Sequence, residues 1–250
     1  MHAIGLTAIG LVRSHNEDTI FYTTEPIGPL PNLFIVADGM GGHSAGEVAS
    51  EKSVEYSRSF IQDATGEQSA EAIMDILVTS AIHANNRVYN LALSDPAVYF
   101  GMGTTFSACA VVGDTLAVAH IGDSRIYTIS PDGIRQITTD HTYVEELVQS
   151  GNITREEART HPRRNVLTRV LGCDPFVSTD GFLCELKGIN HVILCSDGLT
   201  DMLTDEQIME YASQNVPLDT RANALIDAAN REGGKDNISA IIIDVKGEVY

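Results

Sequence analysis

The chain has 250 residues and a mass of 26.9 kDa, close to the upper limit of one hydrophobic core, so we expect a single domain over residues 1–250. With 43% apolar and 20% charged residues it is a globular protein, which excludes disordered, collagenous and coiled-coil classes. Its 34 acidic against 16 basic residues give a net charge of −18, which repels phosphate backbones and anionic lipids; we therefore expect neither nucleic acid nor membrane as a partner.

Apolar runs bounded by glycine, aspartate or proline predict strands over residues 1–12, 33–37, 105–112, 116–121, 125–129, 191–195 and 238–245. Apolar residues at helical spacing predict helices over residues 45–62, 70–93, 205–212 and 220–231. Residues 25–31 are expected to form a loop, and a Gly-Asp turn to join two of the strands as a hairpin. Because helices and strands come in blocks and do not alternate strictly, the order favours an α+β fold with antiparallel sheets.

Residues 140–171 form a basic segment in an acidic chain. Thr154 and Glu157 have the spacing of a capping box that begins a helix, and Pro162 ends it. The segment is either a solvated surface helix or a basic lid that receives anionic substrates. Five of the sixteen basic residues fall within it: Arg155, Arg159, Arg163, Arg164 and Arg169.

Four aspartates stand beside glycines at predicted strand ends: Asp38, Asp123, Asp197 and Asp236. Each alone is typical of a turn, since Asp and Gly tolerate turn geometry. If they converge on one sheet edge, their like charges need cations to stay ionised. Oxygen ligands without a nearby His or Cys cluster favour Mg²⁺ or Mn²⁺ over zinc, and two such ions can activate water for attack on phosphorus.

Two further features bear on the site and on the cellular setting. Arg13 precedes Glu17 and Asp18 and offers a planar, bidentate donor for phosphate, although a surface ion pair is the more ordinary role for such residues. The four cysteines show no CxxC spacing, which favours a reducing cytoplasm. No apolar run approaches the ~18 to 20 residues of a membrane span.

Short motifs follow one another along nearly the whole chain. They are Arg13 with Asn16-Glu17-Asp18, Val36-Ala37-Asp38-Gly39-Met40-Gly41-Gly42, Gly103-Thr104-Thr105, Gly122-Asp123-Ser124-Arg125, Thr139-Asp140-His141, Leu167-Thr168-Arg169 with Leu171-Gly172, Ser196-Asp197-Gly198-Leu199 with Asp201, and Gly233-Gly234 with Asp236-Asn237. In this order they resemble the PPM, or PP2C-type, family of metal-dependent serine/threonine protein phosphatases, especially its short bacterial members.

The resemblance implies a four-layer fold, in which a central sandwich of two antiparallel β-sheets is flanked by α-helices on both sides. Carried over residue by residue, it gives the metal ligands as Asp18, Asp38, Gly39, Asp123, Asp197 and Asp236. Asp38 would bridge two Mn²⁺ or Mg²⁺ ions, Gly39 would bind through its carbonyl, and Asp18, with Glu17 less directly, would act through bound water. Asp123 and Asp197 would hold a third, weaker ion, and Arg13 would bind the substrate phosphate.

The resemblance also implies a reaction and its partners. A hydroxide bridging the metals would attack phosphoserine or phosphothreonine in line, without a phosphoenzyme. The implied partners are phosphorylated proteins and an opposing serine/threonine kinase, and we expect a cytoplasmic monomer without a further domain or anchor. Alternatives are another two-metal phosphoester hydrolase on this fold, or a non-catalytic phosphopeptide-binding module.

One position departs from the pattern. Animal members have histidine directly after the bridging Asp-Gly, whereas this chain has Met40, whose thioether cannot donate a proton. His43 is the candidate proton donor in its place, a water on the third metal is the alternative, and His141 and His161 are weaker candidates. The segment over about 140–171 falls where the family has its flap, and Arg163 and Arg164 are our candidates there for substrate binding.

Overall fold

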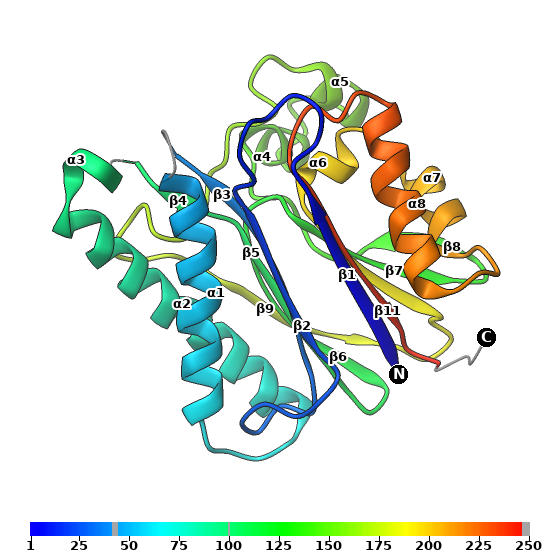
Figure 1. Cartoon of the computed structure of the whole chain (residues 1–250), viewed down its shortest axis with the longest axis horizontal. Coiled ribbons are helices and arrows are strands. Elements are labelled where there is room, and N and C mark those ends of the chain that lie inside the picture. The colour runs from blue at the N-terminus through cyan, green and yellow to red at the C-terminus, as the bar shows by residue number, and fades with distance from the viewer. Residues whose placement is uncertain (42–44, 100, 247–250) are drawn as a thin grey trace.

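The computed structural model describes residues 1–41, 45–99 and 101–246, and two antiparallel β-sheets stack face to face at its centre (Figure 1). The strands of the first sheet are β1 (His2–Ala8), β7 (Arg125–Ser130), β8 (Gly133–Gln136), β10 (His191–Cys195) and β11 (Ile238–Asp244). Those of the second sheet are β2 (Asp18–Thr23), β3 (Leu33–Met40), β4 (Gly103–Thr104), β5 (Phe106–Val112), β6 (Thr115–Ile121) and β9 (Asp180–Glu185). The strand orders are β1-β11-β10-β7-β8 and β2-β3-β5-β6-β9, with β4 beside β3.

Helices cover the outer face of each sheet. The long helices α1 (Ala45–Asp63) and α2 (Ala70–Ser94) pack on the second sheet, and α7 (Asp205–Ala212) and α8 (Leu218–Arg231) pack on the first (Figure 1). The short helices are α3 (Pro96–Tyr99), α4 (Tyr143–Gln149), α5 (Arg155–Thr160) and α6 (Asp197–Thr200). This arrangement confirms the predicted sandwich with helices on both sides.

Side chains alternate between two buried layers along the central strands. On β3, Leu33, Ile35 and Ala37 pack against the helices, whereas Phe34 and Val36 pack against the other sheet. The same alternation holds on β10 and β11. Since both faces of these strands are buried, they read in the sequence as continuous apolar runs, although an antiparallel strand with one solvated face would alternate.

The sequence prediction misses the strands β2, β4, β8 and β9 and the short helices α3 and α4, extends β1 to residue 12 although it ends at Ala8, and differs from the structure at α6. Strand β2 was not predicted, because it lies at a sheet edge, is half-buried and has no long apolar run. The Asp197-Gly198 pair opens α6 instead of a hairpin turn. The predicted hairpin between β5 and β6 is confirmed, with Val112 paired to Thr115 across the Gly-Asp turn. Each of the four predicted helices begins and ends within two residues of its observed bounds.

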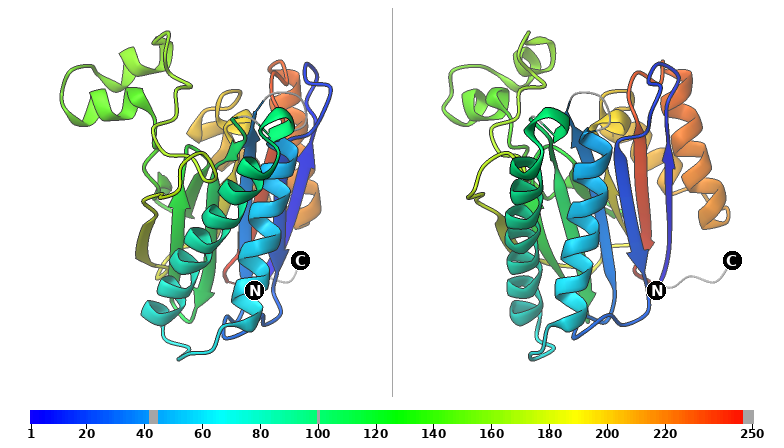
Figure 2. Two further views of the ribbon diagram at one scale, coloured as in Figure 1. Left: turned by 90° about the vertical axis from the view of Figure 1, so that its left-hand side faces the viewer. Right: turned by 60° about the vertical axis from the view of Figure 1, so that its left-hand side comes forward.

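The flap, residues 140–171, carries α4 and α5 and stands out from one end of the sandwich (Figure 2). The capping box at the start of α5 is confirmed, since the Thr154 and Glu157 side chains each accept a backbone N–H from the other residue. No side chain of α5 is buried, so this helix is solvated. Within the described ranges, no helix is both long and apolar enough to span a membrane.

The layer between the sheets is expected to carry much of the stability. Leu194 on β10 is fully buried there, so Leu194→Ala should lower the free energy of unfolding by about 3 kcal/mol through lost burial and the cavity left behind. Leu183→Ala on β9, where the side chain is 36% exposed, is the matched control and should cost less than about 1 kcal/mol. Urea denaturation measures both changes, and equal losses would contradict this assignment of the core.

Candidate metal centre

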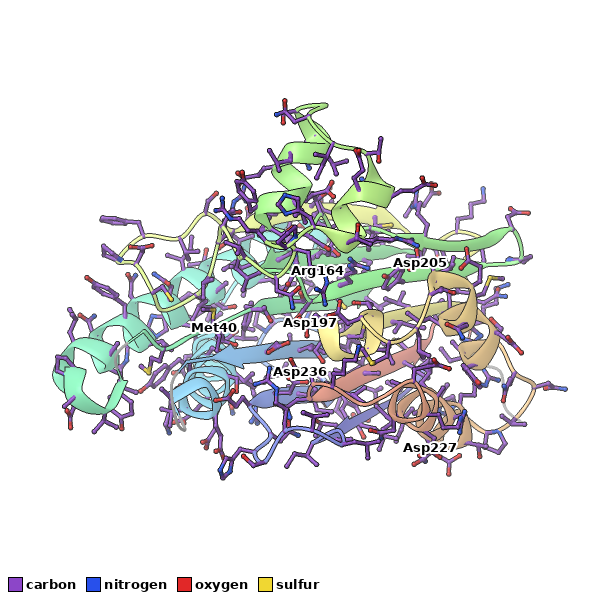
Figure 3. All side chains as sticks on the ribbon, turned by 90° about the horizontal axis from the view of Figure 1, so that it is seen from above. Met40, Arg164, Asp197, Asp205, Asp227 and Asp236 are labelled. Carbon is purple, nitrogen blue, oxygen red and sulfur yellow. The ribbon has the colours of Figure 1, made fainter. Side chains whose placement is uncertain are left out.

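Five aspartates meet at the end of the sandwich where α6 and the flap lie, and they come from β2, from β3, from α6 and from the loops before β7 and β11. We call them the carboxylate cluster: Asp18, Asp38, Asp123, Asp197 and Asp236. Asp18 on β2 is the direct cross-strand partner of Asp38 on β3, and Asp197 opens α6 just after β10. Figure 3, which looks onto this end, shows Asp197 and Asp236 near its centre with Arg164 beside them, while Asp227 lies well away on α8.

The electrostatics of the cluster show that its members act on one another. Burial, followed by repulsion from the other four aspartates, raises the pKa of Asp38 well above its usual range. Burial and repulsion from neighbouring carboxylates do the same to the pKa of Asp197. Burial raises the pKa of Asp18 to about 6, and burial with repulsion from Asp140 raises the pKa of Asp123 to about 7. The cluster therefore favours protons or cations at neutral pH.

The main chain of Asp38 is held on both sides by a threonine pair. The Asp38 N–H donates to Thr105 Oγ1 at 2.9 Å. Its carbonyl accepts from the Thr105 N–H at 2.8 Å and from Thr104 Oγ1 at 2.9 Å. Thr105 Oγ1 also lies 2.7 Å from Ser124 Oγ, on the loop that carries Asp123. These bonds fix Asp38 relative to the loop that carries Asp123 without using the side-chain oxygens of Asp38.

Ser196 connects three strands beneath the cluster. Its hydroxyl donates to Asp18 Oδ2 at 2.7 Å and accepts the Ser239 N–H at 3.0 Å. The other oxygen of Asp18, Oδ1, and Glu17 Oε1 are buried and accept no hydrogen bond from the described residues. An unpaired buried acceptor is costly unless a donor or a cation reaches it.

Close backbone approach at two glycines brings the elements of the site together. A side chain on Gly39 would overlap the carbonyl oxygen of Gly46 in α1, and one on Gly198 would overlap the carbonyl oxygen of Asn237. Only glycine therefore allows α1 to begin against Asp38-Gly39 and α6 to begin against the start of β11. The second contact explains why Asp197 and Asp236, from different loops, lie at one site.

Arg13 reaches the cluster from the loop between β1 and β2. Its Nη2 donates to Asp236 Oδ2 at 2.6 Å. Asn237 holds the same loop, because its amide donates to the carbonyls of Ile9 at 3.0 Å and His15 at 2.9 Å and accepts the Glu17 N–H at 2.9 Å. Asn237 thus positions Arg13, the residue predicted to bind phosphate, over the carboxylate cluster.

The donor chemistry of this end of the molecule fits a hard divalent cation. In the described residues, no three His, Cys, Asp or Glu side chains already enclose a common point closely enough to hold an ion. The side chains that do converge are carboxylates, and the pKa values of Asp18, Asp38 and Asp197 are raised. Asp18 and Glu17 each present an unpaired buried oxygen. Oxygen-only donors of this kind suit Mg²⁺ or Mn²⁺.

The remaining predicted site residues lie around the cluster in different settings. The Arg163 guanidinium stacks 3.7 Å over the Tyr143 ring within the flap. Arg164 Nη2 lies 3.4 Å from Asp201 Oδ2, so it joins the flap to the end of α6. Met40 ends β3 and is 38% exposed, to one side of Asp197 in Figure 3. His43 lies outside the described residues.

Sequence reasoning missed the neutral residues that support the cluster. Ser196 and Asn237 adjoin predicted ligands and belong to the quoted motifs, so their position beside an aspartate was the only available signal. Their partners are remote in the chain: 178 residues separate Ser196 from Asp18, and 220 separate Asn237 from Glu17. Local patterns carry no information on such pairs.

Comparisons with known proteins agree with this geometry. Residues 12–240 match the family model of protein phosphatase 2C. The serine/threonine phosphatase Stp of Listeria innocua is 37% identical over 246 residues, which cover 98% of this chain and 96% of that protein. The crystal structure of the serine/threonine phosphatase Stp1 from Staphylococcus aureus gives a TM-score of 0.90 at 35% identity, covering 98% of this chain and 95% of that one.

A structure that contains metal also resembles this one. The catalytic domain of the serine/threonine protein phosphatase PstP, solved in complex with two manganese ions, gives a TM-score of 0.82 at 33% identity over 97% of each chain. The family model, the near-complete coverage of the relatives and the fold lead to one conclusion. The chain belongs to the protein phosphatase 2C family and is a protein serine/threonine phosphatase.

Proposed function

We propose that this phosphatase removes phosphate from phosphoserine and phosphothreonine in proteins by direct in-line hydrolysis at the carboxylate cluster, with two Mn²⁺ or Mg²⁺ ions and a third, weaker one. The observation that carries the proposal is the convergence of five aspartates at one end of the sandwich, where burial and mutual repulsion raise the pKa values of Asp18, Asp38, Asp123 and Asp197. The chemistry that the ions supply when bound is the acidification of a shared water, which provides the attacking hydroxide.

Each residue of the site has a distinct task in this proposal. Asp38, held by its main chain at the centre, would contact both principal ions, and the Gly39 carbonyl would bind one of them. Asp197 and Asp236 would bind the second, with Asp18 oriented by Ser196. Asp123, together with Asp197, would hold the third. The convergence of carboxylate oxygens from both sheets at one end of the sandwich supports this division of roles.

Arg13 would bind and orient the substrate phosphate. Its Nη2 already lies 2.6 Å from Asp236, which places the guanidinium at the edge of the cluster. A guanidinium carries five N–H donors, so Arg13 can hold two phosphate oxygens while one nitrogen stays on Asp236. His43 stays our candidate for protonating the leaving serine or threonine oxygen, because Met40 carries no titratable proton.

The substrates in this proposal are phosphorylated proteins, and the opposing enzyme is the serine/threonine kinase that forms those phosphates. The flap carries five arginines, which offset its five acidic residues, beside an otherwise acidic body, and this supports a phosphorylated segment lying between the two. We infer that the protein acts as a monomer in the cytoplasm.

Phosphate release from a phosphothreonine peptide tests the proposed activity. We expect release with Mn²⁺ or Mg²⁺ and none with EDTA, and a loss of more than about 100-fold in Asp38→Ala and in Asp236→Ala, the scale on which one electrostatic group of an active site matters. Asp227→Ala, on α8 and away from the site, is the matched control and should retain full activity. A wild type that binds Mn²⁺ but hydrolyses neither peptide nor aryl phosphate would favour the phosphopeptide-binding module instead.

The flap arginines are tested by comparing large and small substrates. Replacing Arg163 and Arg164 together with Ala should lower kcat/KM about 10-fold for a phosphopeptide and much less for p-nitrophenyl phosphate, because only the peptide is long enough to reach the flap. The double variant Arg58→Ala with Arg87→Ala removes the same charge from α1 and α2. It should change kcat/KM for neither substrate. Equal losses on both substrates would show that the flap arginines do not bind the peptide.

Removing the metal should leave a protein whose stability falls as the pH rises. An aspartate titrates near ~3.9 in an unfolded chain, whereas Asp18 titrates at about 6 and Asp123 at about 7 in the fold. Between these values the folded protein binds more protons, so the free energy of unfolding of the metal-free protein falls as pH rises through this window. We expect a lower Tm in EDTA at about pH 8 than at about pH 5.5, and the largest stabilisation by Mn²⁺ at about pH 8.

The variant Asp123→Asn removes one of the raised carboxyls and should make the dependence of Tm on pH in EDTA shallower. A Tm in EDTA that rises steadily from about pH 5.5 to about pH 8 would contradict the electrostatic account of the cluster.

A further inference from the structure

One buried histidine at the base of the flap has no role in the mechanism above. His141 lies between β8 and α4, and its side chain is only 5% exposed. Its ring is 4.8 Å, centroid to centroid, from the ring of His120, whose Nε2 lies 3.1 Å from the Thr139 carbonyl. His141 is therefore enclosed, and its two ring nitrogens and its main chain each hold a neighbouring segment in place.

On one side His141 holds the residue directly before Asp123. The Gly122 N–H donates to His141 Nδ1 at 3.0 Å, and the His141 N–H donates to the Gly122 carbonyl at 2.8 Å. The ring nitrogen thus holds the Ile121–Gly122 peptide and the main chain of His141 holds the Gly122–Asp123 peptide, so Gly122 is fixed on both sides. The backbone of Asp123 follows directly from Gly122, so the direction of the Asp123 side chain depends on these two bonds to His141.

On the other side His141 ties the two ends of the flap together. Its Nε2 lies 3.1 Å from Asp180 Oδ2 on β9, and Asp180 Oδ1 accepts from Arg169 Nη1 at 2.6 Å. The His141 carbonyl accepts the Thr168 N–H at 2.8 Å. The chain therefore enters the flap at His141 and leaves it at residues 168–169, with both ends bonded to one another and to β9.

These partners determine the tautomer of the ring. A backbone N–H can only donate, so Nδ1 must offer its lone pair to Gly122 and the ring proton must sit on Nε2, where it is donated to Asp180. Arg169 Nη1 also lies 3.2 Å from Nε2, and because it too can only donate, it donates to Asp180 Oδ1 and not to the ring. Both nitrogens are then committed to structural partners. His141 has no free proton to give to a leaving group, which argues against it as the proton donor.

We propose that His141 is a positioning residue that orients Asp123 for the weak third cation through Gly122 and sets the base of the flap through Asp180. The inference rests on the proposed function, because it takes Asp123 as a ligand and the flap as a substrate contact. It adds a residue that touches neither metal nor phosphate. One ring thus couples the geometry of a metal ligand to the position of the flap.

Two amide variants separate the two halves of this role. His141→Asn places an amide oxygen near the position of Nδ1, which keeps the acceptor for Gly122 and loses the contact with Asp180. His141→Gln places its amide near the position of Nε2, which keeps the donor for Asp180 and loses the acceptor for Gly122. His83→Asn on α2, whose ring stacks on Phe60, is the matched control.

The first measurement is Mn²⁺ binding by isothermal titration calorimetry, which needs no catalysis. We expect the weakest Mn²⁺ site to lose about 10-fold in affinity in His141→Gln, the lower range for a partner that orients a metal ligand, and to change less than about 3-fold in His141→Asn and His83→Asn. The second measurement is steady-state kinetics with a phosphopeptide. We expect KM to rise in His141→Asn with kcat for p-nitrophenyl phosphate preserved.

The outcomes are distinct. Wild-type values for both variants, or equal losses in both with an equally lowered Tm, would overturn the inference and leave His141 a structural residue. A wild type with no weak third site would overturn the part concerning Asp123. If the wild type hydrolyses no phosphopeptide but the two variants still differ in Mn²⁺ affinity, the proposed function fails and the positioning of Asp123 stands.

Discussion

Repulsion among the five aspartates at one end of the sandwich is the constraint on which the rest of the structure depends. Partly buried carboxylates of like charge raise one another's pKa, as they do at Asp38 and Asp197, and a flexible chain would relax by separating them. The aspartates stay together because they begin, end or join strands and helices of two packed sheets. The energy of the buried layers thus holds a charge arrangement that is unfavourable without cations.

The neutral groups around the cluster act on its geometry and leave its charge unchanged. Thr105 holds the main chain of Asp38, Ser196 donates to Asp18, and Asn237 anchors the loop that carries Arg13. Each of these side chains donates or accepts without neutralising a carboxylate. The cluster therefore keeps its capacity to bind divalent cations while its members stay oriented, as a preorganised site requires.

Arginines in and beside the flap form local contacts and are also the positive charges available to a substrate. Arg125 forms a bidentate pair with Asp140 at the point where the flap begins, and Arg164 reaches Asp201 beside α6. Arg163 lies on the Tyr143 ring. The exposed Arg164–Asp201 pair contributes little to stability, so a phosphorylated segment can displace it at small cost, whereas the Arg125–Asp140 pair is largely buried. The base of the flap, by contrast, is fixed by the hydrogen bonds of the buried His141.

The sequence by itself determined the central strands, the long helices and the identity of the acidic residues. Strands such as β3 and β10 are buried on both faces and so read as unbroken apolar runs, and Asp38 and Asp197 stand beside glycines in the order of a known family. Only the tertiary structure decided that β2 is a strand, since an edge strand has no long apolar run, and that Ser196 bonds to Asp18 across 178 residues. Such contacts depend on which strands become neighbours, and sheet topology is a property of the whole chain.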